Sequence, residues 1–230
     1  MQDQIKRISF SELKNWKECP YRHKLIHIDK VPYFEGNEFT AFGTAIHEVC
    51  EINSALVLDM RTQAETICAQ ILPAIKKYFG NFEVVSVEEQ ILEPINEFES
   101  YGKNFKGFID MVIKTDKNKY HIIDWKTCSW GWSRDKKSDP MTNYQLTYYK
   151  NYFSKKHNIP PKEIETYFVL LKRTAKKENV EVLRITSGLK KTENSLKVLE
   201  NAVINIEKGT SIKNRLSCKY CKFHKTEHCK

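Results

Sequence analysis

Two short stretches, joined by a brief polar turn, place three charged side chains on adjacent predicted strands. The first, at residues 107–110, reads Gly-Phe-Ile-Asp, and the second, at 122–127, reads Ile-Ile-Asp-Trp-Lys-Thr. Apolar, β-favouring residues surround both stretches, which predicts a hairpin. Because side chains alternate between the two faces of a strand, Asp124 and Lys126 project from the same face. We therefore expect Asp110 and Asp124 to face each other across the hairpin, with Lys126 beside them.

This grouping of charges has a specific chemical meaning. Two carboxylates brought so close repel each other unless a cation lies between them. Hard oxygen ligands of this kind favour Mg²⁺ or Mn²⁺ over zinc. The Lys126 ammonium group could then stabilise the negative charge that builds up when a phosphodiester is attacked. An Asp-x-Lys tripeptide also occurs by chance at strand ends, so the rest of the chain has to support this hypothesis.

The complete pattern is Gly-x-x-Asp, a short turn, an apolar strand and Asp-Trp-Lys-Thr. It resembles the PD-(D/E)XK nuclease superfamily, and within it the RecB-like exonucleases. The resemblance implies that Asp110, Asp124 and the backbone carbonyl of Trp125 bind the divalent metal, while Lys126 acts on the attacking water. It also implies a DNA exonuclease that works on DNA ends in recombination, repair or the replication of a mobile element. A helicase or a recombinase would be a fitting protein partner.

Two further motifs match this family. Gly-Thr-Ala-Ile-His at 43–47 resembles its Gly-x-x-x-His motif, on a helix predicted over 40–56, and the resemblance implies that His47 is a further metal ligand. Without it, such a histidine would be interpreted as a packed or surface residue. Gln145 and Tyr149 resemble its Gln-x-x-x-Tyr motif, and their spacing puts both on one helical face, where they could contact a DNA phosphate or steady Lys126. Burial in an aromatic-rich core is an equally open interpretation for this helix.

The cysteines suggest a second metal site. Cys218, Cys221 and Cys229 crowd the last 13 residues of a chain that has seven cysteines, and a C-x2-C pair is a common unit of zinc and iron-sulfur ligation. Cys19 follows a Ser-x-Ser-x-Leu pattern and precedes a proline, which resembles the opening of AddB-type and CRISPR-associated exonucleases. The resemblance implies that these four cysteines hold a [4Fe-4S] cluster that joins the chain ends.

A structural zinc site is the alternative for these cysteines. Seven residues separate Cys221 from Cys229, whereas five are more usual in the family, and the longer loop contains two histidines. Cys218, Cys221, His228 and Cys229 could therefore bind Zn²⁺ locally.

The net charge of +9 is unevenly distributed. Residues 1–149 carry 19 Lys and Arg against 21 Asp and Glu, whereas residues 150–230 carry 19 against 8. A basic surface attracts phosphate backbones, although a run of lysines is more often only a solvated face. The predicted DNA contacts are Lys155, Lys156, Lys172, Arg173, Lys176 and Lys177.

The remaining patterns predict an α/β fold, with a mixed central sheet flanked by helices around a restriction-endonuclease-like core. Pro73 is expected to break a helix predicted over 61–79, and residues 130–139 are expected to form a mobile loop over the site. Other helices are predicted over 9–24, 141–157 and 190–208, and strands over 84–92, 105–114, 120–127, 165–172 and 180–186.

Length and composition complete these expectations. A chain of 230 residues that is 40% hydrophobic can bury one good core, which predicts a single domain over 1–230. Within it, segments near 8–24 and 209–230 would form the cysteine cluster. The sequence shows neither a secretory signal nor a membrane span, so we expect a cytoplasmic, intracellular protein.

Two other functions stay open at this point. One is a DNA-end-binding module whose cluster is structural or redox-responsive and whose cleavage depends on a partner. The other is a structure-specific endonuclease on the same fold. The complete set of Asp110, Asp124 and Lys126 argues against an inactive relative, and no P-loop motif for an ATP-driven motor is present.

Overall fold

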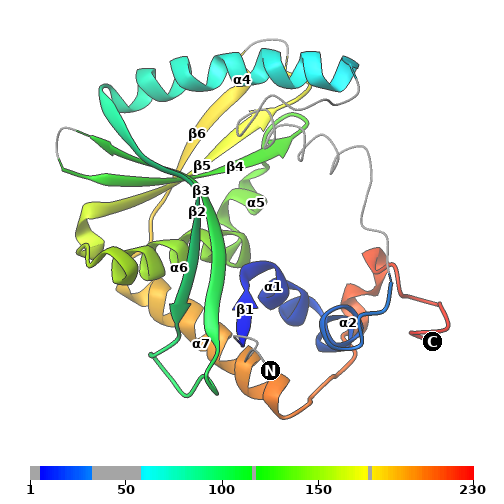
Figure 1. The fold of residues 1–230 in the computed structure, drawn as a ribbon. Helices are drawn as coiled ribbons and strands as arrows, with labels where there is room; N and C mark the ends of the chain where they lie inside the picture. The colour runs from blue at the N-terminus through cyan, green and yellow to red at the C-terminus, as the bar shows by residue number, and fades with distance from the viewer. Residues whose placement is uncertain (1–5, 33–57, 116–117, 176–177) are drawn as a thin grey trace. The chain divides into compact units, whose positions relative to one another are not determined.

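The computed structural model describes residues 6–32, 58–115, 118–175 and 178–230 (Figure 1). Its internal contacts divide the chain into two compact units. The central unit comprises residues 35–91 and 108–191, and the terminal unit comprises residues 1–34, 92–107 and 192–230. Strands β2 (Phe82–Pro94) and β3 (Asn104–Thr115) have residues in both units.

The central unit is built on a mixed sheet. Strand β3 pairs antiparallel with β4 (Tyr120–Cys128), β4 pairs parallel with β5 (Ile164–Lys172), and β5 pairs antiparallel with β6 (Val180–Ile185). A parallel pair needs a long crossover connection, and helix α6 (Pro140–His157) provides it between β4 and β5. The strand pairings confirm the predicted hairpin and the predicted mixed sheet.

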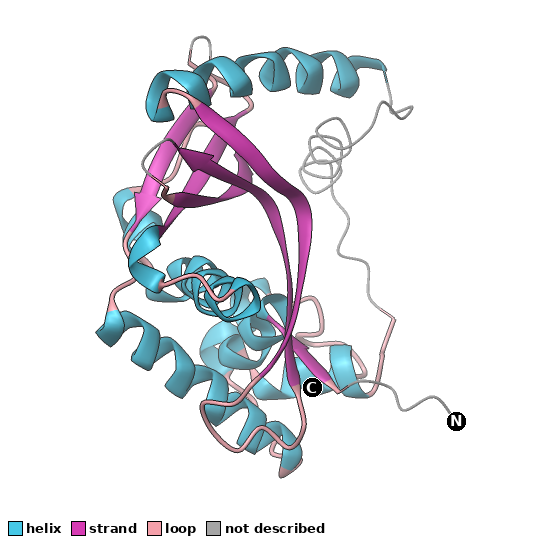
Figure 2. Ribbon diagram, turned by 60° about the vertical axis from the view of Figure 1, so that its left-hand side comes forward, coloured by secondary structure: helices cyan, strands magenta, loops and turns pink. Residues whose placement is uncertain are grey.

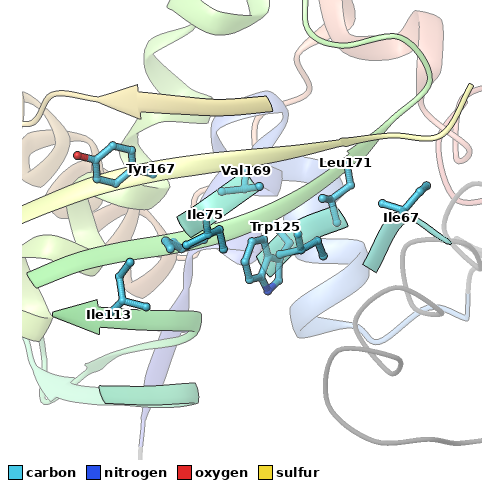
Figure 3. Packing of buried hydrophobic residues seen from close by; sticks show 9 residues of the cluster. Ile67, Ile75, Ile113, Trp125, Tyr167, Val169 and Leu171 are labelled. Atoms are coloured by element: carbon cyan, nitrogen blue, oxygen red, sulfur yellow. The ribbon is translucent and has the colours of Figure 1, made fainter. Parts of the chain in front are cut away.

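Helix α4 (Leu58–Phe79) covers one face of this sheet, and α6 covers the other (Figures 1 and 2). The α4 face is a dry core, in which isoleucines spaced four residues apart on the helix meet alternate residues of the strands (Figure 3). The cluster comprises Ile67, Ile71, Ile75, Ile113, Ile123, Trp125, Tyr167, Val169 and Leu171.

The predicted break at Pro73 is wrong, because α4 continues through this residue. Pro73 is on an exposed position of the helix, while Ile71 and Ile75 on either side of it are buried against the sheet. The backbone hydrogen bond that proline cannot make is therefore lost on the solvent side, where water can compensate, and the buried neighbours keep the helix in register.

The α6 face carries the aromatic side chains that the sequence placed on this helix. Asp139 caps the helix by accepting a hydrogen bond from the Thr142 amide at 2.8 Å, and Asn158 ends it in the left-handed conformation at φ 53°. Tyr148, Tyr152 and Phe153 are fully buried. The predicted loop at 130–139 contains a short helix, α5 (Arg134–Ser138), so that expectation is wrong in part.

The terminal unit joins both ends of the chain. Strand β1 (Arg7–Ser9) pairs parallel with the first residues of β3, and a helical segment follows it. This segment comprises α1 (Phe10–Glu18), α2 (Pro20–His23) and the π-helix η1 (Lys24–Ile28). The remaining elements of the chain are η2 (Pro161–Glu163), α7 (Leu189–Glu207) and η3 (Arg215–Tyr220). Among the helices that the structure describes, none is long and apolar enough to cross a membrane.

Replacing Phe153 with alanine should lower the free energy of unfolding by about 3–5 kcal/mol, because the fully buried ring would leave a cavity on the α6 face. Chemical denaturation followed by circular dichroism measures this change. Leu189→Ala is the control, since that side chain is 85% exposed and its loss should change the free energy by less than about 0.5 kcal/mol. Similar losses in both variants would contradict the placement of Phe153.

Candidate active site

The site begins where the pairing of β3 with β4 ends. The pairing runs from Lys114 with Tyr120 to Met111 with Ile123, and it ends there, just before Asp110 and Asp124. Beyond it, the Trp125 amide donates its hydrogen bond to the Asp110 carboxylate, with 2.6 Å between N and Oδ2, rather than to the backbone of β3. The Asp110 side chain is thereby fixed against the stretch of β4 that carries Asp124. Both aspartates are buried, with 7% and 1% of their surface exposed.

Burial and mutual repulsion perturb this pair of carboxylates. The pKa of Asp110 is raised from 3.8 to about 8, first by burial and then by the charge of Asp124. The positive charge of Lys126 and the Trp125 amide act in the opposite direction but do not cancel these effects. Without a metal ion, Asp110 therefore keeps its proton at neutral pH, and only a nearby cation would make two negative charges favourable here.

Each oxygen of Asp124 has a different environment. Oδ1 accepts a hydrogen bond from Gln145 Nε2 at 2.9 Å. Oδ2 lies 2.5 Å from Lys126 Nζ, but it has no hydrogen-bond partner of acceptable geometry although it is buried. This buried oxygen therefore faces a cation, Lys126, rather than a donor in hydrogen-bond geometry.

Gln145 and Tyr149 meet at the same carboxylate. Gln145 Nε2 also lies 3.1 Å from the Tyr149 hydroxyl, as the spacing of four on one helical face requires. The pKa of Tyr149 is raised, first by burial and then by the charge of Asp124, so its phenol stays neutral. The structure thus brings Gln145 to Asp124 directly and Tyr149 through its contact with Gln145.

Lys126 lies at the edge of this group. Its side chain is 31% exposed, and its Nζ atom lies 5.6 Å from the centre of the Phe168 ring. Lys126 can therefore contact both the buried Asp124 and a substrate that arrives from solvent.

Glu88 on β2 is a residue that the sequence analysis missed. Its negative charge is a further cause of the raised pKa of Asp110, which places it close to the carboxylate pair. Its backbone is in the left-handed region at φ 48°, which is unusual for a residue within a strand. No motif distinguishes it from the adjacent Glu89, so the sequence offered no signal for it.

The remaining predicted residues either lie outside the described residues or have other contacts in the structure. His47, Lys176 and Lys177 lie outside the described residues. Lys156 binds Glu89 at 2.7 Å and Lys172 lies 3.9 Å from Glu181, so both have partners within the fold. Lys155 lies over the ring of Tyr152, and the amide of Arg173 binds the Cys128 carbonyl.

The four cysteines predicted to bind a cluster do come together. Within the terminal unit, Cys19, Cys218, Cys221 and Cys229 all line one cavity of about 440 Å³. The histidine among the residues that line it is His224, whereas the zinc hypothesis used His228. In the described part of the chain, no three His, Cys, Asp or Glu side chains are arranged to hold a single metal ion, either here or at the aspartates.

Hydrogen bonds tie the two chain ends together around this cavity. The Tyr21 amide binds the Ile212 carbonyl at 3.1 Å, and the Ser217 hydroxyl donates to the Glu18 carbonyl at 2.6 Å. The Asn214 amide lies 3.4 Å from the Cys19 sulfur, toward which its N–H points. These contacts position Cys19 beside the C-terminal cysteines although some 200 residues separate them in sequence.

Comparisons with known proteins identify the family and the fold. The family model of the PD-(D/E)XK nuclease superfamily matches residues 7–226. A crystal structure from Eubacterium rectale, provisionally described as an exonuclease, has a TM-score of 0.66 at 13% identity and covers 94% of this chain and 86% of its own. The structure of the protein SSO0001 has a TM-score of 0.50 at 19% identity, with 97% of this chain and 86% of that chain covered.

At these identities, the two structural matches show a shared fold and no more. A comparison with curated proteins gives no match. The family model, in contrast, spans almost the whole sequence and includes all the residues assembled at the buried carboxylates. The chain therefore belongs to the PD-(D/E)XK nuclease superfamily.

Proposed function

We propose that this protein is a metal-dependent DNA exonuclease that hydrolyses phosphodiester bonds at DNA ends. The observation that carries the proposal is the buried pair of Asp110 and Asp124, with the Lys126 ammonium 2.5 Å from the second carboxylate. A nuclease needs a negatively charged metal-binding group and a positive charge near the reacting phosphate, and these three side chains supply both.

The residues at this site fit a hard divalent cation, Mg²⁺ or Mn²⁺. The two carboxylates are buried together, and the pKa of Asp110 is raised although Lys126 lies beside Asp124, so a further positive charge would be favourable here. Asp110, Asp124, the Trp125 carbonyl and His47 would hold the ion. When bound, the ion polarises the phosphate and activates water.

The protein's own groups have separate tasks in the proposed reaction. Lys126 stabilises the additional negative charge on the phosphate in the transition state, since it can contact both Asp124 and solvent. Gln145 and Tyr149 keep Asp124 in one orientation, so they act as positioning residues. Trp125 contributes through its backbone, which is fixed because its side chain is part of the core on the opposite face.

The preference for DNA ends is supported by analogy of fold. The Eubacterium rectale protein is provisionally described as an exonuclease, and its fold covers most of this chain. An end-processing enzyme would serve recombination, repair or the replication of a mobile element, together with a helicase or a recombinase. We assign the DNA contacts to the basic residues after position 149, namely Lys155, Lys156, Lys172, Arg173, Lys176 and Lys177.

We further propose that the cysteine cavity holds a [4Fe-4S] cluster that joins the chain ends. Four thiols lining one cavity of about 440 Å³ provide the ligand set of such a cluster, and a volume of this size exceeds what one ion occupies. The buried side chains of Leu25 and Phe223 shield the cavity from water. Cationic side chains also line it, namely Arg22, Lys213, Arg215, Lys225 and Lys230.

Replacing Asp124 with asparagine or Lys126 with alanine should reduce the digestion of linear DNA in Mg²⁺ or Mn²⁺ by about 100-fold or more, because the first removes a charge that would hold the metal and the second a charge that acts on the reacting phosphate. Binding of DNA should change little, since the basic surface supplies most of the affinity. Gel analysis of linear and covalently closed circular DNA measures both activity and the need for ends.

Lys162→Ala is a matched control for Lys126, because this exposed lysine precedes β5 and should not affect cleavage. Digestion of closed circles would favour an endonuclease on the same site. Binding without digestion in any divalent metal would favour the DNA-end-binding module. Full activity of either Asp124→Asn or Lys126→Ala would contradict the site.

The raised pKa of Asp110 should make metal-free folding depend on pH. The folded protein holds this proton more tightly than the unfolded chain, whose pKa is 3.8. The stability associated with Asp110 is thus present below about pH 4 and lost as the pH rises toward 8. Relative to Asp110→Asn, the unmodified protein should lose stability between about pH 5 and pH 8 in chelator, and Mn²⁺ should restore it at the upper pH. If the free energy of unfolding in chelator changed with pH in the same way for both proteins, this expectation would be refuted.

Protein purified without oxygen should contain about four iron atoms and four sulfides per chain. Cys221→Ser should lose this content and unfold at lower temperature, because the chain ends would no longer be joined through the cluster. Cys128→Ser is the control, since Cys128 belongs to β4 and does not line the cavity. Elemental analysis that finds one zinc per chain and no sulfide would instead establish the zinc alternative.

A further inference from the structure

A tryptophan just beyond the active-site strand is unusually exposed. Trp130 follows the end of β4 by two residues, and 74% of its surface is accessible. Trp125, in contrast, is 6% exposed, and Trp132 is partly buried. An indole ring left in water is unfavourable, and in a binding protein such a ring commonly marks a contact surface.

The backbone on both sides of Trp130 is firmly held. The Ser129 carbonyl accepts hydrogen bonds from the amide and the hydroxyl of Thr174, at 3.0 and 2.6 Å. Gly131, the next residue, has φ 121°, a conformation that side chains rarely adopt. The chain turns there, so Trp132 packs back onto Phe168 with 5.1 Å between ring centres, while Trp130 stays in solvent.

These contacts place the Trp130 segment beside the reacting groups. The ring of Phe168 that supports Trp132 is the same ring that lies 5.6 Å from Lys126 Nζ. On the other side, Asn143 of α6 donates to the Lys137 carbonyl at 3.1 Å, two residues before Gln145. The segment is thus braced by β5 and by α6, which are fixed to the strand that carries Asp124.

Positive charges follow Trp130 in the chain, on the short helix after Trp132. Arg134 and Lys136 are exposed on α5, and Lys136 Nζ lies 5.0 Å from the Trp132 ring. An aromatic face next to cations is the combination that binds unpaired nucleotides, in which the base stacks on the ring and the backbone phosphates meet the charges. Bases inside a duplex are stacked on both faces, so an unpaired strand offers such a ring many more free base faces than a duplex does.

We propose that Trp130 stacks on an unpaired base next to the cleaved phosphodiester, which makes single-stranded DNA ends the preferred substrate. This inference rests on the proposed function and specifies its substrate. Arg134 and Lys136 contact the phosphates of the same strand, without reading its sequence.

The test uses the Asp124→Asn background, so that DNA is bound but not consumed. Affinity is measured by fluorescence anisotropy for a labelled single-stranded oligonucleotide and for a blunt hairpin duplex of the same composition. Trp130→Ala should weaken single-strand binding by about 5- to 100-fold, whereas Trp130→Phe should retain most of it, because a phenyl ring still stacks. Duplex binding should change by less than about threefold, since phosphate contacts dominate it.

One further readout and one control variant separate base stacking from other roles of Trp130. Intrinsic tryptophan fluorescence should be quenched by the single-stranded oligonucleotide, and Trp130→Ala should remove most of that quenching. Tyr101→Ala is the control, because it removes another exposed aromatic ring at a turn and should leave single-strand binding unchanged. Unchanged single-strand affinity in Trp130→Ala, or equal losses for both DNA forms, would overturn the proposal.

Failure of this inference differs from failure of the proposed function. If the unmodified protein digests DNA and the Trp130 variants bind single strands normally, only the stacking proposal is wrong. If the unmodified protein neither binds nor digests DNA, the nuclease proposal fails, and the substrate preference fails with it.

Discussion

The hydrogen bond between the Trp125 amide and the Asp110 carboxylate is the contact on which the site depends. The bond forms where the backbone pairing of β3 with β4 ends, so the Asp110 side chain, and not a backbone carbonyl, accepts the hydrogen bond of the Trp125 amide. The indole of Trp125 is anchored in the α4 core on the opposite face of the sheet. The position of the first carboxylate is therefore set by the packing of the interior, and the remaining site residues arrange themselves around it.

Around this contact, the protein maintains an electrostatic arrangement that is unfavourable by itself. Asp110 and Asp124 are buried together and Glu88 adds negative charge, so the pKa of Asp110 is raised although Lys126 and the Trp125 amide act in the opposite direction. Such a group costs stability in the free protein and gains from any cation that enters. On α6, Gln145 donates a hydrogen bond to Asp124 and another to the Tyr149 hydroxyl, while Asp110 is held by the Trp125 amide.

The sequence predicted the parts of this structure that depend on local periodicity. The hairpin, the aromatic helix α6 and the last helix α7 follow from alternation and from a repeat of about four residues, and the structure has all three. Pro73 was misjudged because its effect depends on which side of the helix faces solvent, and that is decided by packing against a sheet. Glu88 could not be found, since its left-handed backbone has no counterpart in residue type.

Contacts between segments that are far apart in the sequence could be predicted only from the resemblance to a known family. Nothing in the periodicity of the chain brings Cys19 to the cysteines after position 217. The zinc alternative used His228 because this residue lies in the same C-terminal stretch as Cys218, Cys221 and Cys229. The structure places His224, not His228, at the cavity, since the turns after Cys221 decide which side chain points inward. The division into two units likewise depends on long-range contacts, and the prediction of one domain over 1–230 stays a prediction.

The interleaving of the two units has a consequence for biosynthesis. The central unit draws on residues up to 191, whereas the cavity of the terminal unit needs Cys19 and Cys229 together. During translation, the segment that carries Cys19 therefore stays without its C-terminal contacts until the residues of the central unit and of the C-terminal segment have been synthesised. The carboxylate site can form early, but the cavity can be completed, and any cofactor inserted, only after the last cysteine has been made.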